Sequence, residues 1–142
     1  MSAKKCLSFV LLSLLLIAVM GCSDSDADLG PISHGDIANE KPLTQSDIDA
    51  YIAILPEIAP VEHVDGQAAA AIYKKYGLSR LRYKYIKTKI PFCAGMNAGR
   101  TYDFSKVPAS MKPNEAELSL VNANLDAIDA AHQLYRQKVV NK

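Results

Sequence analysis

The chain has little of what metal and disulfide chemistry requires. Its 142 residues include three cysteines, three histidines and no tryptophan. Neither an HExxH nor a CxxC motif occurs, and histidines and cysteines are not clustered, which argues against a dedicated zinc site. We therefore predict no metal centre and no bound cofactor.

Strict alternation of apolar and polar residues is also scarce, whereas apolar residues often recur three and four positions apart. This spacing disfavours strands and predicts an all-α fold. The roughly 100 residues from 44 to 142 suit a single domain. We expect them to form a small bundle of three to five helices.

A long apolar run is missing as well. The uncharged stretch over residues 7–20 has fourteen residues, whereas a helix that crosses a hydrocarbon core needs about 20. Lys4 and Lys5 precede this stretch, and Gly21 follows it. A positive start, an apolar stretch of this length and a small residue at its end are typical of a secretory signal peptide.

The end of this stretch, Val19-Met20-Gly21-Cys22, resembles the lipobox of bacterial lipoproteins. Met20 is a departure, because Ala, Ser or Thr is more usual there. The resemblance implies that residues 1–21 are removed as a signal peptide and that the Cys22 thiol carries diacylglycerol. Two or three acyl chains give stable anchoring, at about 0.8 kcal/mol per buried methylene. The alternatives are an ordinary signal peptide and an uncleaved anchor.

The residue after Cys22 bears on the destination of the lipoprotein. In enteric-type bacteria an Asp at this place favours the inner membrane, but here the residue is Ser23. The resemblance therefore favours the outer membrane, with the domain facing the periplasm.

Residues 22–43 are rich in Asp, Ser and Gly and show no apolar period. Such a composition buries too little apolar surface to offset the entropy of ordering. We expect a flexible acidic linker between the lipid and the domain. The alternative is that Leu29 or Ile32 docks on the domain.

Four helices are predicted within residues 44–142. Thr44 and Asp47 form a capping-box pattern for the first, which Pro56 and Pro60 end or kink. A second helix is expected from about 64 to 76, with Gly77 as its C-cap. Ser79 caps a third helix, which Pro91 stops or kinks, and residues 92–112 are expected to be mostly loop.

The last predicted helix begins at a second capping-box pattern, Asn114 with Glu117. Seven residues follow at alternating spacings of three and four and form one stripe: Leu118, Val121, Leu125, Ile128, His132, Tyr135 and Val139. We expect this stripe to pack into the bundle, with His132 as a core histidine that has a hydrogen-bond partner. The alternative is that the stripe forms a dimer seam.

The charges are unevenly distributed. Residues 23–65 carry ten acidic residues and one basic residue, whereas residues 66–142 carry thirteen basic and five acidic residues. The basic density peaks in residues 73–89, where seven of seventeen residues are basic: Lys74, Lys75, Arg80, Arg82, Lys84, Lys87 and Lys89. Four tyrosines interleave with them: Tyr73, Tyr76, Tyr83 and Tyr85.

This basic-tyrosine region could bind anionic lipid headgroups, lipopolysaccharide phosphates or another polyanion, because basic residues attract phosphate and tyrosine suits a wet interface. Alternatively, the charges are ordinary solvated helix positions and the tyrosines belong to the core. The acidic linker could also lie against this face. We do not expect nucleic acid as a partner, because an exported, lipid-anchored chain seldom meets it.

Candidate chemistry elsewhere is sparse. Cys6 leaves with the signal and Cys22 carries lipid, so Cys93 has no intramolecular partner, and its apolar neighbours predict burial. Cys93, His132 and Asp129 have the residue types of a nucleophilic set, but no local motif links them.

Another alternative is a small-ligand or metal carrier that uses His63, Cys93 and Met96. The sequence favours a membrane-anchored envelope lipoprotein whose helical domain has a binding, interaction or structural role and is not an enzyme. The expected partners are the membrane and either an envelope protein or an anionic lipid.

Overall fold

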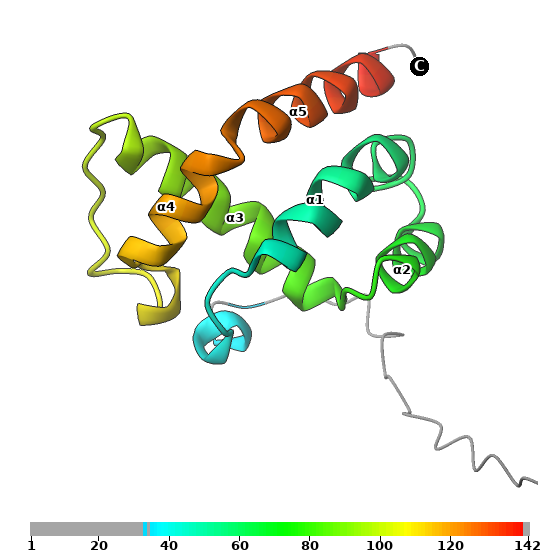
Figure 1. The fold of residues 1–142 in the computed structure, drawn as a ribbon. Coiled ribbons are helices and arrows are strands. Elements are labelled where there is room, and N and C mark those ends of the chain that lie inside the picture. Colours follow the sequence, from blue (N-terminus) through cyan, green and yellow to red (C-terminus); the bar gives the residue numbers. More distant parts are fainter. Residues whose placement is uncertain (1–32, 34, 141–142) are drawn as a thin grey trace, which may run out of the picture.

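The computed structural model describes residue 33 and residues 35–140, which form five α-helices and two short 3₁₀ helices (Figure 1). In chain order these are η1 (Asp36–Asn39), α1 (Gln45–Ile58), α2 (Gly66–Lys75), α3 (Arg80–Asn97), η2 (Ala109–Met111), α4 (Glu115–Ala123) and α5 (Leu125–Val140). These residues contain no strand, so the predicted small all-α bundle is confirmed. None of their helices combines the length and the apolar character of a membrane span. The expected signal peptide, Cys22 and residues 22–32 of the linker lie outside the described residues.

The predicted helix starts are confirmed by their caps. At α1 the Thr44 side chain accepts a hydrogen bond from the Asp47 amide, and the Asp47 carboxylate accepts one from the Thr44 amide. Asn114 and Glu117 form the same reciprocal pair at α4. These caps satisfy amide groups that have no partner within the helix.

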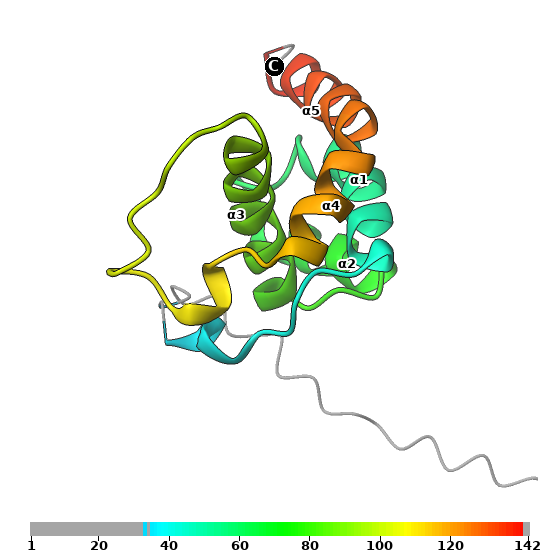
Figure 2. The ribbon, with the colours of Figure 1, turned by 60° about the vertical axis from the view of Figure 1, so that its left-hand side comes forward.

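The helices pack mainly as two pairs, with α2 at one end of the bundle (Figure 1). α5 runs along α1, and α4 packs against α3 (Figures 1 and 2). Between them lies a core of aliphatic and tyrosine side chains, of which the largest fully buried members include Ile48, Tyr51, Ile54, Tyr85 and Ile86. Burial of such side chains contributes about 1.5–3 kcal/mol each.

The third helix is longer than the sequence indicated. α3 passes Pro91 and ends at Asn97, so the expectation of a loop from residue 92 was wrong for residues 92–97. Proline in a helix interior costs about 3 kcal/mol. Here Pro91 is exposed, whereas Ile90 and Cys93 beside it are buried in the core, and this burial offsets the cost.

The last predicted helix is two helices. It is interrupted at Asn124, whose side chain donates a hydrogen bond of 2.8 Å to the Leu120 carbonyl and exchanges two of 3.1 Å with the Gln45 amide. Asparagine amides compete with backbone hydrogen bonds in this way. The break allows α4 to pack on α3 and α5 on α1. The predicted apolar stripe still faces the bundle, except that Val139 is exposed.

Residues 36–43, which we expected to belong to the flexible linker, pack on the helices. Ile37 and Leu43 are buried. The Ser110 hydroxyl donates a hydrogen bond of 2.7 Å to the Ile37 carbonyl, and the Leu43 amide donates one of 2.9 Å to Glu117. Burial of Ile37 and Leu43 holds this segment on the helices, although its composition predicted a flexible linker.

Gly95 allows a close contact between α3 and the segment after it. A β-carbon at this buried position would lie 1.8 Å from the Tyr102 hydroxyl and 2.8 Å from its ring. We expect Gly95→Ala to displace Tyr102 from its ring contacts with Phe92 and Phe104. The free energy of unfolding, measured in urea, should fall by about 1–3 kcal/mol.

Gly35→Ala is the matched control for this substitution. Gly35 has a φ of −64°, and its added β-carbon would meet only the Ser33 hydroxyl, at 3.5 Å. It should change stability by less than about 0.5 kcal/mol. Equal effects of the two substitutions would contradict the role assigned to Gly95.

Candidate functional site

The seven basic residues of the basic-tyrosine region (residues 73–89) do not form an open cationic strip. Four of them are in ion pairs: Lys75 with Glu57, Arg82 with Glu40 and Asp47, Lys87 with Glu62, and Lys89 with Glu117. Most of this positive charge is therefore compensated inside the domain.

Lys89 is buried, with 1 % of its surface exposed, and it lies 3.1 Å from the carboxylate of Glu117, which is equally buried. Its amino group also donates hydrogen bonds to the Tyr85 hydroxyl and to the carbonyls of Ser110 and Lys112. An ammonium group has three donors, and these three oxygens use them. Lys89 is therefore a buried residue of the domain interior and does not contribute to a binding surface.

Arg82 holds the acidic segment before α1. It donates a two-pronged pair of hydrogen bonds to Asp47, at 3.0 and 2.6 Å. Three more go to Glu40 and to the carbonyls of Lys41 and Pro42, at 3.0, 2.6 and 2.9 Å. All five guanidinium donors are thereby used. The alternative in which acidic linker residues lie against the basic face is confirmed for residues 40–42.

The tyrosines of the region are mainly core residues. Tyr73, Tyr83 and Tyr85 are buried, and the rings of Tyr73 and Tyr83 lie 4.7 Å apart. Tyr76 is half-buried, and its hydroxyl donates to Glu57 at 2.6 Å. The alternative in which the tyrosines belong to the core is therefore confirmed for the three buried residues.

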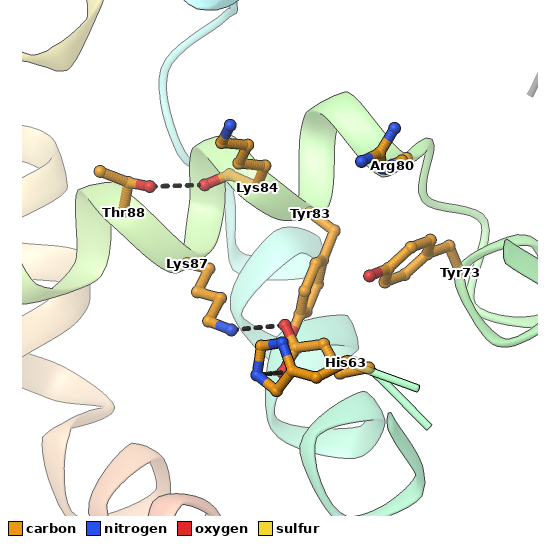
Figure 3. A pocket seen from close by; sticks show the side chains of 8 residues that line it. His63, Tyr73, Arg80, Tyr83, Lys84, Lys87 and Thr88 are labelled. Carbon is orange, nitrogen blue, oxygen red and sulfur yellow. Dashed lines mark hydrogen bonds and ion pairs between the residues drawn. The ribbon is translucent and has the colours of Figure 1, made fainter. Parts of the chain in front are cut away.

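Five members of the region line a cavity of about 460 Å³ (Figure 3): Tyr73, Arg80, Tyr83, Lys84 and Lys87. We call it the α2–α3 cavity. It is lined by Glu62 and His63 from the turn after α1, by Tyr73 from α2, and by Arg80, Tyr83, Lys84, Lys87 and Thr88 from α3. With His63 neutral, this lining has three cations and one carboxylate, a net charge of +2.

The carboxylate in the lining is fully engaged. One oxygen of Glu62 accepts from Lys87 and the other accepts from the Tyr135 hydroxyl at 2.6 Å. Burial alone would raise the pKa of Glu62, but these hydrogen bonds outweigh it and keep the pKa below its ordinary value. Glu62 is therefore ionised at neutral pH, with its charge balanced by Lys87.

One polar atom beside the cavity lacks a partner. Tyr83 has 2 % of its surface exposed, and its buried hydroxyl has no hydrogen-bond partner among the described residues. Figure 3 shows its side chain reaching from α3 toward His63, with the hydroxyl end of Tyr73 directed at it. Burial raises the pKa of Tyr83 above its ordinary value, so the hydroxyl keeps its proton and is a donor.

The other candidate residues are separated in the structure. Cys93 is buried in α3, and burial raises the pKa of its thiol to about 11, which disfavours the thiolate that a nucleophile or a metal ligand requires. His132 Nε2 lies 2.9 Å from the Tyr51 hydroxyl, so the prediction of a hydrogen-bonded histidine is confirmed. Burial lowers the pKa of His132.

The three residues of the suggested carrier site have different surroundings. His63 is exposed and lies 3.8 Å from Glu62, whereas Cys93 is fully buried and Met96 half-buried. In the part of the chain that the structure describes, no three His, Cys, Asp or Glu side chains are grouped closely enough to hold a metal ion.

Sequence reasoning singled out the cations, both tyrosines and His63 of the cavity, but it missed the contacts that these residues and Glu62 make. Glu62 and Tyr135, which form a hydrogen bond, lie 73 positions apart in the chain, and no local sequence pattern predicts this contact. Tyr83 was recognised as part of the basic-tyrosine region, but its missing partner is visible only in three dimensions. Comparisons with family models, with curated proteins and with solved structures gave no match for this chain.

Proposed function

We propose that this chain is a membrane-anchored lipoprotein of a bacterial cell envelope whose small helical domain has a binding role and is not an enzyme. The observation that carries the proposal is the order of residues 4–22: two lysines, an uncharged apolar stretch, a small residue and Cys22. This order suits export, followed by lipid attachment at Cys22. The outer membrane, with the domain facing the periplasm, is the proposed location.

The side chains of the domain support a non-catalytic role. Two residues of the suggested nucleophilic set, Cys93 and His132, are packed in the domain: the thiol is buried with a raised pKa, and the imidazole is hydrogen-bonded to Tyr51. A nucleophile needs a base within hydrogen-bond reach and an accessible thiolate. Burial of the thiol works against this requirement.

A second candidate function is the binding of an anionic ligand. The α2–α3 cavity favours it, because Arg80, Lys84 and Lys87 line one concave surface with a net positive lining. The anionic partner is then a small group that enters a cavity, in contrast to a polymer that lies along all seven basic residues.

The lipid anchor can be tested by Cys22→Ala. We expect this substitution to abolish labelling by a fatty-acid analogue in cells and to shift the protein from the membrane fraction to the soluble fraction, since the thiol that would carry the lipid is gone. The matched control is Cys6→Ala, which removes a thiol within the apolar segment and should keep both the label and the membrane location. Undiminished labelling of Cys22→Ala would refute the anchor.

A further inference from the structure

We propose that the segment between α3 and α4, residues 98–114, rests on an anionic phospholipid surface through its aromatic and basic side chains. We call this segment, which includes η2, the α3–α4 loop. The inference rests on the proposed lipid anchor, which would keep the domain beside a membrane, and it gives the domain a second, non-covalent membrane contact.

Aromatic side chains gather at the start of the α3–α4 loop. The rings of Tyr102 and Phe104 lie 5.1 and 5.4 Å from the ring of Phe92 on α3, and 6.0 Å from each other. All three residues are half-buried, and Phe92 packs against the hydrophobic core. Part of each residue is therefore exposed to solvent. Such side chains suit a membrane interface, where one part of a ring is in apolar surroundings and another is in water.

The charge of the loop is complementary to anionic lipid. The loop carries three cations, Arg100, Lys106 and Lys112, and one carboxylate, Asp103, which gives a net charge of +2. All four residues are exposed, and none of them takes part in an ion pair within the part of the chain that the structure describes. The Asp103 carboxylate accepts a hydrogen bond of 2.9 Å from the Ser105 amide. Each cation close to an anionic bilayer strengthens the association about fivefold.

The path of the chain brings this loop to the side of the domain that an anchor at Cys22 would hold. Ten residues separate Cys22 from residue 33, and at no more than about 3.6 Å per residue they keep the domain within about 40 Å of the membrane. The chain enters the domain at η1, which packs against η2, and the Ser110 hydroxyl donates a hydrogen bond of 2.7 Å to the Ile37 carbonyl. Figures 1 and 2 show η1 beside η2, and in Figure 1 α2 lies at the far end of the bundle from the loop. The anchor would therefore keep the loop at a high local concentration of lipid, where a weak contact is sufficient.

The absence of tryptophan from the chain allows a direct test. Phe104→Trp places a single fluorescent reporter in the loop, and Tyr76→Trp places one at another half-buried aromatic position, directly after α2. Each full-length protein, produced with its lipid, is reconstituted into vesicles of phosphatidylglycerol with brominated acyl chains, which quench tryptophan on contact. Relative to vesicles without bromine, we expect the emission of Phe104→Trp to fall about twofold and that of Tyr76→Trp to stay unchanged. Phe92→Trp reports on the same three rings from α3 and replaces Phe104→Trp if that variant does not fold.

Charge variants test the selectivity for anionic lipid. In the Phe104→Trp protein, Arg100→Gln and Lys106→Gln each remove an exposed cation of the loop. We expect each of them to lower the ratio of membrane-bound to unbound loop, obtained from the quenching, about fivefold. Lys74→Gln removes an exposed cation of α2 and should leave this ratio unchanged. Vesicles of brominated phosphatidylcholine, which carry no net charge, should quench less than those of phosphatidylglycerol.

Flotation of the vesicles separates the loop contact from the anchor. A protein that floats with the vesicles, but whose loop reporters are quenched no more than Tyr76→Trp, would overturn the loop contact and leave the anchor in place. Equal quenching in both lipids, without an effect of Arg100→Gln or Lys106→Gln, would also overturn the proposal, because the contact would then not select anionic lipid. A protein that does not float would refute the anchor, and the loop contact that depends on it would fail as well.

Discussion

Replacing Lys89 with methionine should lower the free energy of unfolding by about 3–5 kcal/mol. Methionine keeps most of the volume, so the loss comes from charge and hydrogen bonding. Without the ammonium group, the buried Glu117 carboxylate loses the cation 3.1 Å away, and the carbonyls of Ser110 and Lys112 lose a donor. The pair joins α3 and α4, and Glu117 also accepts a hydrogen bond from Leu43 in the segment before α1.

The complementary substitution, Glu117→Gln, should destabilise by a similar amount. It leaves the Lys89 charge buried, and the Gln side chain has one acceptor oxygen for the two amides, of Leu43 and Asn114, that Glu117 now serves. The double variant should lose less than the sum of the two single losses, by about 1–3 kcal/mol, because residues in contact do not act additively. Urea unfolding followed by far-UV circular dichroism measures all three.

Lys74→Met is the matched control, since Lys74 is an exposed helical lysine. It should change the stability by no more than about 0.5 kcal/mol. A small loss for Lys89→Met, or strict additivity in the double variant, would show that the buried pair does not stabilise the fold.

The parts of this fold that the sequence predicts correctly are encoded locally. Thr44 with Asp47, and Asn114 with Glu117, mark helix starts because a cap and its partner lie three residues apart. The left-handed Gly77, with a φ of 69°, follows α2 as the C-cap pattern indicated. Such features depend on neighbours along the chain.

The sequence-based predictions are wrong where contacts between residues far apart in the chain determine the structure. Pro91 does not end α3, because its neighbours on the buried face are held by the core. Asn124 interrupts an otherwise continuous apolar stripe, because its amide pairs with Gln45, 79 positions away. Lys89 belongs by composition to a basic run, yet its partner is Glu117 on another helix. None of these partners can be read from local spacing.

In the candidate site, too, the sequence shows which residues are present, whereas long-range contacts determine how they are paired. The sequence places many cations in residues 73–89 but does not reveal which of them are neutralised within the fold. Packing pairs Arg82 and Lys89 with internal acids. It also pairs Lys87 with Glu62 and places Lys87 with Arg80 and Lys84 in the lining of a cavity. A broad surface hypothesis therefore becomes a hypothesis about one concave site.

Arg82→Lys should loosen the attachment of residues 40–42 to the domain and lower the free energy of unfolding by about 2–3 kcal/mol. Lysine keeps the charge but has three donors and no planar fork. It can replace neither the two-pronged contact with Asp47 nor all the bonds to Glu40 and to the two carbonyls. Hydrogen exchange of the Glu40 and Leu43 amides should accelerate more than that of core amides in α1.

The hydrogen bonds that Asp47 accepts from Arg82 and Thr44 should make the stability of the domain depend on pH. Burial alone would raise the pKa of Asp47, but hydrogen bonds from Arg82 and Thr44 outweigh burial and hold the pKa below the unfolded value of 3.8. The folded state therefore binds this proton less readily than the unfolded chain, so the contribution is complete above the unfolded pKa and is lost as pH falls through the folded pKa.

Unfolding in urea at a series of pH values from about 5 downward measures this contribution. The parent should lose stability steeply over this range. Asp47→Asn should lose less, because it cannot titrate, and Arg82→Lys should fall between the two. Asp49→Asn is the control, since Asp49 is exposed on the same helix and its carboxylate accepts a hydrogen bond of 2.8 Å from the Gln45 amide. Parallel curves for the parent and Asp47→Asn would show that this carboxylate does not couple the acidic segment to the fold.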